Sequence, residues 1–212
     1  MTAPTPIRLY HFTHVEHLPT IVRDGLRGDS LVQVSGSLIR EAGEPDIKAR
    51  RRLAPVDAGS RGVVADYVPF YFAPRSPMLY VIQQGSVPSY EGSQRDLVYL
   101  CTTVETLQDD GIVLVLTDRN AATAYAEFSD DPSAWGDLVD WPLMKARMWN
   151  NTLDDPDRMQ RRMAECLAHP EVPWSAVIAV GVADERMERT VQLALDAAGV
   201  ATRIIVRPKW YY

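Results

Sequence analysis

The sequence predicts an α+β fold, and three observations lead to this prediction. Short apolar segments rich in β-branched and aromatic residues recur along the chain, as expected of strands. Amphipathic segments with helical spacing lie between some of them. The two kinds of segment do not alternate strictly, which argues against the parallel sheet of an α/β protein. No repeat or Pro/Gly/Ser-rich linker divides the chain, so we expect residues 1–212 to form a single domain.

The first strand is expected over residues 7–12, followed by a turn over residues 13–17. Pro19 fits the first turn of a helix, where its missing N–H costs nothing, better than a helix interior. We therefore expect a short helix that begins at about residue 18 and ends at Gly25.

Residues 26–62 are polar and irregular, with one possible helix over residues 38–52. A segment of this length inside a compact domain usually has a function or is disordered. Residues 68–72 then predict an aromatic strand edged by Pro69 and Pro74.

Capping residues mark two helices in the middle of the chain. Ser76 can cap a helix that starts at the following proline. Asp118 can cap a helix that runs through an alanine-rich stretch to Ala126. Between them, residues 97–102 and 112–116 are apolar and β-branched, which predicts two strands.

The last third of the chain mixes polar and apolar segments. Residues 129–162 form a polar region rich in tryptophan, with one helix expected near residues 141–149. Beyond it, the pattern predicts a strand over residues 176–182, an amphipathic helix over residues 185–198 and a final strand over residues 202–206.

The composition is that of an ordinary globular protein, with 46% apolar and 24% charged residues. No apolar run approaches the roughly 18–20 residues of a membrane span. The first eight residues lack the apolar segment of a signal peptide, so we expect a cytoplasmic protein without a membrane partner. Cys101 and Cys166 are far apart and lack CxxC spacing, which predicts two buried thiols in a reducing compartment.

The net charge of −6 argues against a protein that coats nucleic acid without sequence preference. Such binding depends on many Lys and Arg contacts to phosphate. A local basic groove is still compatible with this charge. Positive side chains gather in three short groups, at Lys48, Arg50, Arg51 and Arg52, at Arg158, Arg161 and Arg162, and at Arg203, Arg207 and Lys209.

Three histidines follow the spacing H-x2-H-x2-H, at His11, His14 and His17, which suggests zinc. The geometry is unfavourable, because steps of three residues drift by about 60° each on a helix and alternate faces on a strand. The ordinary alternative is one histidine that faces the core and two that are exposed to solvent. We therefore expect no metal site.

Two further charged features have two interpretations each. The arginines at residues 50–52 are either a solvated helix face or, because Arg offers a rigid fork of donors, a binding site for a pyrophosphate. If Glu165 lies on a helix, it forms a weak pair with Arg161 one turn away. If it lies on a strand, its carboxylate is either solvated or part of a site.

The aromatic and proline-rich segment at residues 69–78 also has two interpretations. It is either a core strand followed by a capped helix or a platform on which a nicotinamide ring or a nucleobase stacks. The motifs GxGxxG and GxxxxGK[ST] are absent, so the sequence supports neither a Rossmann dinucleotide site nor a P-loop.

Taken together, several segments resemble the DarT family of DNA ADP-ribosyltransferase toxins, in the right order and over essentially the whole chain. They are Tyr10-His11-Phe12-Thr13-His14 with Leu18-Pro19 and Gly25, Arg51, Asp66-Tyr67-Val68-Pro69-Phe70-Tyr71-Phe72, Arg75-Ser76-Pro77-Met78-Leu79-Tyr80, Thr117-Asp118-Arg119, Ala164-Glu165 and Trp210-Tyr211-Tyr212. The resemblance implies an ADP-ribosyltransferase fold, which is a split, mostly antiparallel sheet with helices around it and NAD+ in the cleft between its halves.

The resemblance also implies roles for individual residues. NAD+ is a co-substrate, and no resident cofactor is expected. Glu165 would be the catalytic glutamate and Arg51 the catalytic arginine, on a loop at residues 26–62 that closes over NAD+. The residues implied in NAD+ binding are His11, Phe12, Thr13, Thr20, Tyr71 and Arg51.

A thymine base in single-stranded DNA is the implied acceptor, and residues 119–164 would present it. The residues implied in DNA binding are Arg75, Met78, Arg119, Asn120, Arg158 and Arg162. Asn120 departs from some relatives, which carry histidine there. The family further implies the toxin of a toxin–antitoxin pair, whose partner is a macrodomain antitoxin that removes the modification.

Two alternatives stay open at this point. The same fold could modify guanine in DNA, RNA or a protein side chain. A chain that binds NAD+ or DNA without turnover is the other alternative, but such a protein has no need of a catalytic glutamate at Glu165.

Overall fold

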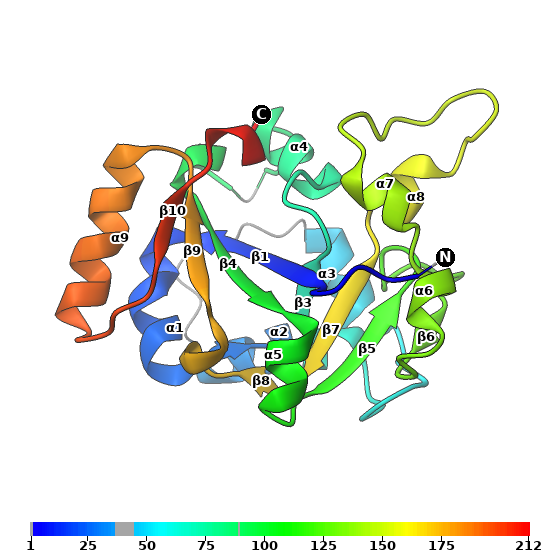
Figure 1. Ribbon diagram of the computed structural model, residues 1–212, viewed down its shortest axis with the longest axis horizontal. Coiled ribbons are helices and arrows are strands. Elements are labelled where there is room, and N and C mark those ends of the chain that lie inside the picture. The colour runs from blue at the N-terminus through cyan, green and yellow to red at the C-terminus, as the bar shows by residue number, and fades with distance from the viewer. Residues whose placement is uncertain (1, 37–44, 89) are drawn as a thin grey trace.

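The computed structural model describes residues 2–36, 45–88 and 90–212. Its central element is an eight-stranded sheet (Figure 1). In sheet order the strands are β10 (Ile204–Val206), β9 (Ala179–Val182), β4 (Leu97–Thr103), β1 (Arg8–His14), β3 (Val68–Tyr71), β7 (Glu165–His169), β5 (Val113–Thr117) and β6 (Phe128–Ser129). Neighbouring strands pair antiparallel apart from β9 and β10, which pair in parallel. This confirms the predicted α+β fold with a mostly antiparallel sheet.

The sheet is split between β1 and β3. β1 pairs with β4 at seven positions, and β3 pairs with β7 at four. β1 and β3 themselves pair at one position, Tyr10 with Tyr71. The strands therefore diverge away from this contact, which gives the two-part sheet that the family resemblance implies.

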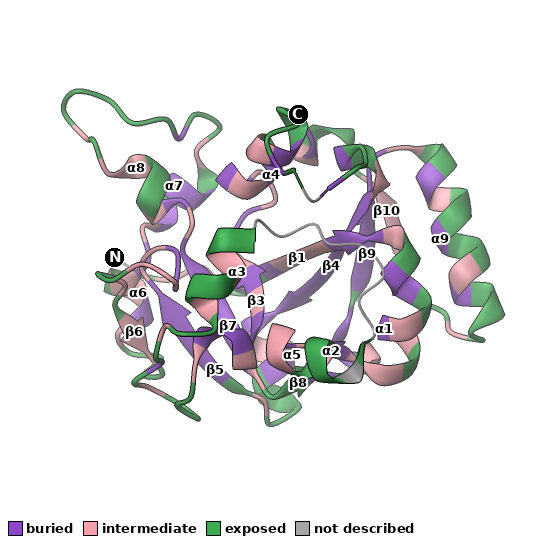
Figure 2. Ribbon diagram, turned by 180° about the vertical axis from the view of Figure 1, so that it is seen from behind, coloured by how far each residue is buried: buried purple, intermediate pink, exposed green. Residues whose placement is uncertain are grey.

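Helices surround the sheet, and a two-stranded sheet of β2 (Leu26–Arg27) and β8 (Glu171–Val172) lies beside it (Figure 1). The α-helices are α1 (Leu18–Asp24), α2 (Asp29–Ser35), α3 (Pro45–Arg51), α4 (Pro77–Gln83), α5 (Val104–Asp109), α6 (Trp135–Leu138), α7 (Trp141–Lys145), α8 (Arg158–Arg161) and α9 (Glu185–Ala197). Short 3-10 helices cover Val15–His17, Val64–Asp66, Gln94–Asp96, Trp174–Ala176 and Pro208–Trp210. Figure 2 shows that the central strands are largely buried and that exposed residues concentrate on the helices and loops around them.

Alternation along β1 explains how the sheet is covered on both faces. Successive side chains of a strand point to opposite faces. Leu9 belongs to a large core that includes residues of α1 and α9. Tyr10 and Phe12 pack against a second core that includes Leu79 of α4 and Tyr211. Cys101 and Cys166 are both buried, as predicted.

The capping signals explain which predicted helices are confirmed. The Ser76 hydroxyl accepts a hydrogen bond from the backbone N–H of Leu79 at 3.2 Å, at the start of α4. Asp184 caps α9 in the same way, and Gly25 ends α1 with a φ of 83°. The strands expected at residues 7–12, 68–72, 97–102, 112–116, 176–182 and 202–206 correspond to β1, β3, β4, β5, β9 and β10.

The helix predicted from Asp118 to Ala126 is wrong. Residues 118–127 form turns that connect β5 to β6. The Asp118 carboxylate accepts a hydrogen bond from the backbone N–H of Glu127 at 2.9 Å, so it closes this connection instead of capping a helix. The helix expected near residues 141–149 ends at Lys145, and β9 begins at Ala179 after a 3-10 turn.

The long segment at residues 26–62 is more regular than predicted. It contains α2, which the sequence did not predict, and α3. The possible helix at residues 38–52 is matched by α3 over residues 45–51, and its part at residues 38–44 lies outside the described residues. Within the described parts of the chain, no helix is both long and apolar enough to cross a membrane.

Candidate active site

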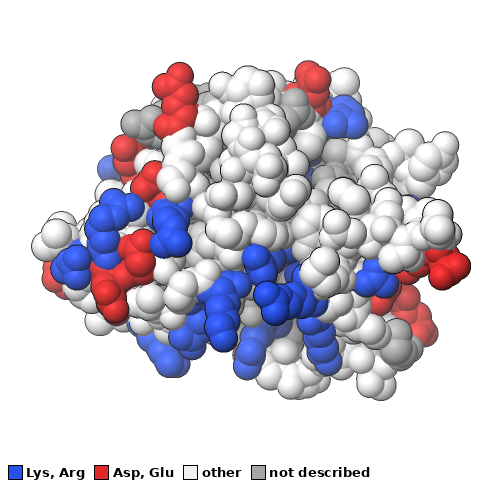
Figure 3. Space-filling model, turned by 90° about the horizontal axis from the view of Figure 1, so that it is seen from above, with Lys and Arg blue, Asp and Glu red and all other residues white. Residues whose placement is uncertain are grey.

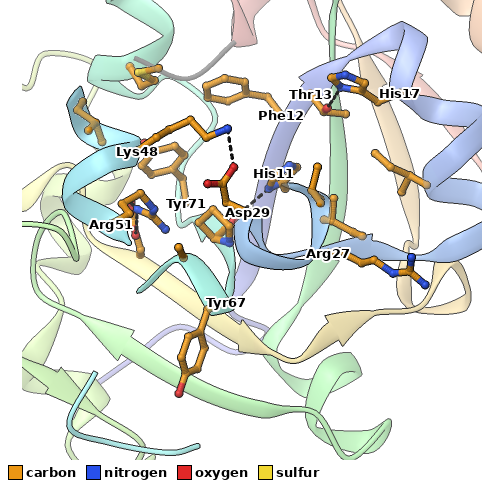
Figure 4. A pocket seen from close by; sticks show the side chains of 18 of the residues that line it. His11, Phe12, Thr13, His17, Arg27, Asp29, Lys48, Arg51, Tyr67 and Tyr71 are labelled. Atoms are coloured by element: carbon orange, nitrogen blue, oxygen red, sulfur yellow. Dashed lines mark hydrogen bonds and ion pairs between the residues drawn. The ribbon is translucent and has the colours of Figure 1, made fainter. Parts of the chain in front are cut away.

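A cavity of about 370 Å³ lies beside the split in the sheet. β1, α1, α2, α3, β3, α4 and β7 contribute side chains to its wall, so it draws on both halves of the sheet (Figure 4). Residues predicted to contact NAD+ or to act on it all line this cavity: His11, Phe12, Thr13, Thr20, Arg51, Tyr71 and Glu165. Of the residues predicted to contact DNA, Met78 and Asn120 also line it.

Arg51 and Glu165 form an ion pair across the cavity although 114 positions separate them in the sequence. Nη1 of Arg51, the last residue of α3, lies 3.0 Å from Oε1 and 2.9 Å from Oε2 of the carboxylate. The two side chains are 12% and 2% exposed. Glu165 begins β7, so the interpretation that places it on a strand holds and the weak helical pair with Arg161 does not form.

The protein fixes Glu165 from the neighbouring strand β5. The backbone N–H of Glu165 donates to the hydroxyl of Thr117 at 3.0 Å, and this hydroxyl donates to the carbonyl of Arg119 at 2.6 Å. Burial raises the pKa of Glu165, and the Arg51 guanidinium counteracts this rise. Arg51 therefore favours the ionised form of the buried carboxylate.

One nitrogen of Arg51 is available to a ligand. Nη2 is buried and has no hydrogen-bond partner among the described residues. Buried polar groups are normally hydrogen-bonded, and an orphaned donor beside a cavity is expected to meet a bound oxygen. The neighbouring arginines differ, because Arg50 is exposed and Arg52 pairs with Asp29.

His11 joins the two halves of the sheet. Its Nδ1 lies 2.8 Å from the carbonyl oxygen of Pro69 on β3, so Nδ1 carries the proton and donates. Burial lowers the pKa of His11 to about 4, which makes the ring neutral and leaves Nε2 as an acceptor. Nearby, the rings of Phe12 and Tyr71 stack with centroids 6.2 Å apart and planes 15° from parallel.

The other two histidines are buried, so the expectation that they are exposed to solvent is wrong. His14 is 6% and His17 is 9% exposed. Nδ1 of His17 lies 2.9 Å from the hydroxyl of Thr13, and both residues line the cavity (Figure 4). His14 contacts Tyr90 edge to face. Within the described chain, no group of three or more His, Cys, Asp or Glu side chains is arranged to hold a metal ion.

The cavity wall also contains residues that the sequence did not assign to a site, among them His17, Asp29 and Lys48. His17 lies just before α1 and was grouped with the zinc-like spacing. Asp29 and Lys48 form an ion pair inside the cavity, with Nζ 2.5 Å from Oδ1 (Figure 4). Asp29 lies on α2, which was not predicted, so nothing indicated that it would face α3. The basic group around Lys48 was the one available signal.

The arginines predicted to contact DNA lie outside the cavity wall. Arg119 pairs with Asp118 at 2.7 Å and with Asp157 at 3.3 Å. Arg158 donates to the carbonyl of Met148 and lies 3.7 Å from a carboxylate oxygen of Asp155. Much of the positive charge in this region is therefore neutralised by nearby aspartates.

Arg162 and Arg75 occupy a different environment. Arg162 is 5% exposed, and its Nη1 donates to the carbonyls of Leu143 and Met144 at 2.6 and 2.8 Å. Its Nε and Nη2 donate to the carbonyl of Arg75. Arg162 thus already uses its donors inside the protein, whereas the Arg75 guanidinium lies over the ring of Tyr212. Figure 3 shows Lys and Arg side chains gathered together on the face seen from above.

Comparison with known proteins places this geometry in context. The family model described as ssDNA thymidine ADP-ribosyltransferase, DarT, matches residues 10–212. The DNA ADP-ribosyl transferase of Mycobacterium tuberculosis (strain ATCC 25618 / H37Rv) is 36% identical over 209 residues, which cover 96% of this chain and 88% of that protein. A Thermus sp. 2.9 DarT in complex with ADP-ribosylated ssDNA superposes with a TM-score of 0.92 at 31% identity, covering 100% of this chain and 99% of the other.

Two further relatives are a solved structure with NAD+ and a fusion protein. Thermus sp. 2.9 DarT in complex with NAD+ has a TM-score of 0.85 at 30% identity, with 100% of each chain covered. A Thermosipho africanus (strain H17ap60334) protein is 22% identical over 205 residues, which cover 96% of this chain and 49% of that protein. It is described as a fusion of a DNA ADP-ribosyl transferase with a DNA ADP-ribosyl glycohydrolase.

Proposed function

Because this chain belongs to the DarT family of ssDNA thymidine ADP-ribosyltransferases, it is a DNA ADP-ribosyltransferase that uses NAD+, and we propose that the cavity beside the split sheet is its active site. The observation that carries this proposal is the buried pair of Arg51 and Glu165, in one cavity with a neutral His11. Paired fixed charges in a site shielded from water suit a reaction in which charge develops.

NAD+ lies with its nicotinamide against β1 and β3. The stacked rings of Phe12 and Tyr71 offer flat apolar faces to the nicotinamide. His11, Thr13 and Thr20 supply polar groups along the same wall. The cavity and its polar lining are of the kind that binds small molecules.

Glu165 stabilises the transition state. Breaking the bond between nicotinamide and C1′ of the ribose builds positive charge on C1′, as in glycoside cleavage. A carboxylate bonded to the adjacent 2′-hydroxyl stabilises that charge. A ring nitrogen of thymine then bonds to C1′ and loses its proton to solvent, while nicotinamide leaves as a neutral molecule with the electrons of the broken C1′–N bond. The free Nη2 of Arg51 donates to a pyrophosphate oxygen, since a guanidinium keeps its proton.

DNA reaches the cavity at Met78 and Asn120, which line it. Arg75, Arg119 and Arg158 lie outside the wall and contact the strand that carries the base. A single strand exposes its bases without the cost of opening a duplex. A protein of net charge −6 can bind such a strand through a few local contacts.

The test incubates the protein with labelled NAD+ and with single-stranded DNA, duplex DNA, RNA or protein. We expect label on single-stranded DNA, with thymidine as the modified nucleoside by mass spectrometry. Glu165→Gln should lower the rate about 10²- to 10³-fold, as the loss of an oxyanion-hole donor does. Glu185→Gln, an exposed change on α9, serves as the matched control and should leave the rate unchanged.

Other outcomes would contradict parts of this proposal. Label on guanine, RNA or protein would change the acceptor, and label that survives in Glu165→Gln would remove the carboxylate from the mechanism. Binding of NAD+ without any label would favour the non-catalytic alternative. Loss of label in EDTA would revive a metal site at the three histidines.

We further propose that the protein is a toxin whose partner is a macrodomain antitoxin. The Thermosipho relative, in which a transferase and a glycohydrolase form one protein, supports a partner that removes ADP-ribose from DNA. Expression of the wild type should stop growth of a host cell, and co-expression of an active DNA ADP-ribosyl glycohydrolase should restore it. Equal growth arrest with active and inactive glycohydrolase would contradict removal as the mechanism.

A further inference from the structure

We propose that Tyr212 is a positioning residue for DNA binding. Its ring orients the guanidinium of Arg75, which in turn contacts the single strand. The inference rests on the proposed function in one respect, which is the contact of Arg75 with single-stranded DNA. Arg75 directly precedes the cap of α4, and Pro77 and Met78 on that helix line the cavity. Arg75 therefore lies beside the wall at which the target base must arrive.

Within the part of the chain that the structure describes, the guanidinium of Arg75 lies over an aromatic ring and pairs with no carboxylate. Its Cζ lies 4.3 Å from the centroid of the Tyr212 ring. Among the described residues, Nε of Arg75 is buried without a hydrogen-bond partner. Arg119, Arg158 and Arg161 in contrast pair with aspartates.

This difference matters for an anionic ligand. A carboxylate that orients an arginine also neutralises it, and DNA must then compete with the carboxylate. An aromatic face attracts the cation while it leaves the net charge and the N–H groups available. Arg75 is thus oriented in advance and still carries its full positive charge.

Tyr212 can act as a support because it is anchored independently of Arg75. The amide of Gln94 accepts from the backbone N–H of Tyr212 at 2.9 Å and donates to its carbonyl at 2.5 Å. The Tyr212 ring also contacts the ring of Tyr80, with centroids 5.2 Å apart. Replacing the ring removes the support while these backbone contacts stay in place.

The backbone of Arg75 is fixed from the other side. Nε and Nη2 of Arg162 donate to the Arg75 carbonyl at 3.3 and 3.1 Å. Arg162 in turn holds the carbonyls of Leu143 and Met144 on α7. The backbone of Arg75 is therefore held by Arg162, and its charged end is held by Tyr212.

The experiment compares Tyr212→Leu with Tyr212→Phe in steady-state kinetics. Tyr212→Leu should raise KM for single-stranded DNA about 5- to 30-fold, the factor that corresponds to loss of a cation–π contact. Tyr212→Phe keeps the ring and should stay near the wild type. KM for NAD+ should change in neither variant, because Tyr212 does not line the cavity.

Arg75→Lys provides a second measurement in case Tyr212→Leu folds poorly. Lysine keeps the charge but lacks the planar group that stacks on a ring, so KM for DNA should rise here too. In the double variant with Tyr212→Leu, the two effects should not add, because both changes remove one contact. Thermal unfolding of each variant checks that the fold is retained.

Each remaining outcome decides against the inference. A normal KM for DNA in Tyr212→Leu, together with a raised KM in Arg75→Ala, would overturn the role of Tyr212 and leave the proposed function intact. A normal KM in Arg75→Ala would overturn the DNA contact on which the inference rests. Full additivity of the two changes would mean that Tyr212 and Arg75 act separately.

Discussion

Arg51 opposes the effect of burial on the pKa of Glu165 and so favours the ionised carboxylate. Glu165 is 2% exposed, so its charged form has lost most of its hydration. This loss costs free energy unless a nearby cation compensates for it. Arg51 does so through two short contacts, and one more of its nitrogens is left for a ligand. At the scale of single residues, we assign the pair to the proposed chemistry of the site, because a buried ion pair is weak evidence for the stability of a fold.

The two partners should therefore be coupled in stability. Arg51→Gln leaves Glu165 buried without its cation and should lower the free energy of unfolding by about 3 kcal/mol. Glu165→Gln added to Arg51→Gln should restore a large part of this loss. The cost of the single change should shrink as pH falls, because protonation neutralises the lone Glu165. Urea unfolding at two pH values measures both effects, and additive losses in the double variant would contradict the coupling.

His11 should make stability depend on pH in the opposite sense to Glu165. In the unfolded chain a histidine takes up a proton near pH 6.5, whereas in the fold burial lowers the pKa of His11 to about 4. Between these values the unfolded state binds more protons, so the free energy of unfolding falls as pH falls from 6.5 to 4. The loss is at most about 3 kcal/mol for such a shift.

His11→Asn isolates this contribution. The asparagine amide can still donate to the Pro69 carbonyl, but it does not titrate. Between pH 7.5 and pH 4.5 the wild type should lose more stability than the variant, while Glu165 contributes equally to both. Parallel losses in the two proteins would show that His11 does not carry the effect.

At the scale of elements, α4 shows how a helix cap can position residues of the cavity wall. Ser76 is buried, its hydroxyl caps the helix, and Pro77 and Met78 of that helix line the cavity. Ser76→Ala should lower the free energy of unfolding by about 1 kcal/mol, the usual cost of losing an N-cap. Ser86→Ala, at an exposed serine, should change it little. Equal effects of the two changes in urea unfolding would contradict the role of the cap.

The same local signals explain how much of the fold the sequence could predict. α4 and α9 carry a cap followed by apolar residues at helical spacing, and both were predicted. α2 and α5 have seven and six residues, too few for a periodic pattern to stand out. Asp118 resembles a cap, but its carboxylate bonds to Glu127 across a connection between strands, which local sequence does not reveal.

Local sequence patterns were not sufficient to predict the site. Spacing left open whether Glu165 lies on a helix or a strand, and it offered no reason to join Glu165 to Arg51. The pair forms because α3 lies across the cavity, where Lys48 and Arg52 also hold Asp29 of α2. Contacts between residues so far apart in the chain follow from tertiary structure. The family resemblance placed Arg51 and Glu165 in one site, but it did not predict their ion pair or the contacts of Asp29.

Charge at the scale of the whole molecule limits how DNA is bound. The net charge is −6, and Arg119, Arg158 and Arg161 form ion pairs with aspartates that neutralise part of their positive charge. Each phosphate that a protein neutralises on a single strand adds about 0.7 to the slope of log affinity against log salt. A few local contacts therefore predict a shallow slope of about −1 to −3.

The dependence of KM for single-stranded DNA on NaCl concentration measures this slope. Arg75→Ala should reduce its magnitude by about 0.7, because one phosphate contact is lost. Arg189→Ala, at an exposed arginine on α9, should leave it unchanged. A slope steeper than about −4 would require six or more phosphate contacts. That many contacts would mean that cations beyond Arg75, Arg119 and Arg158 also bind phosphate, so the protein would read its strand through a broad basic surface and not through these few contacts.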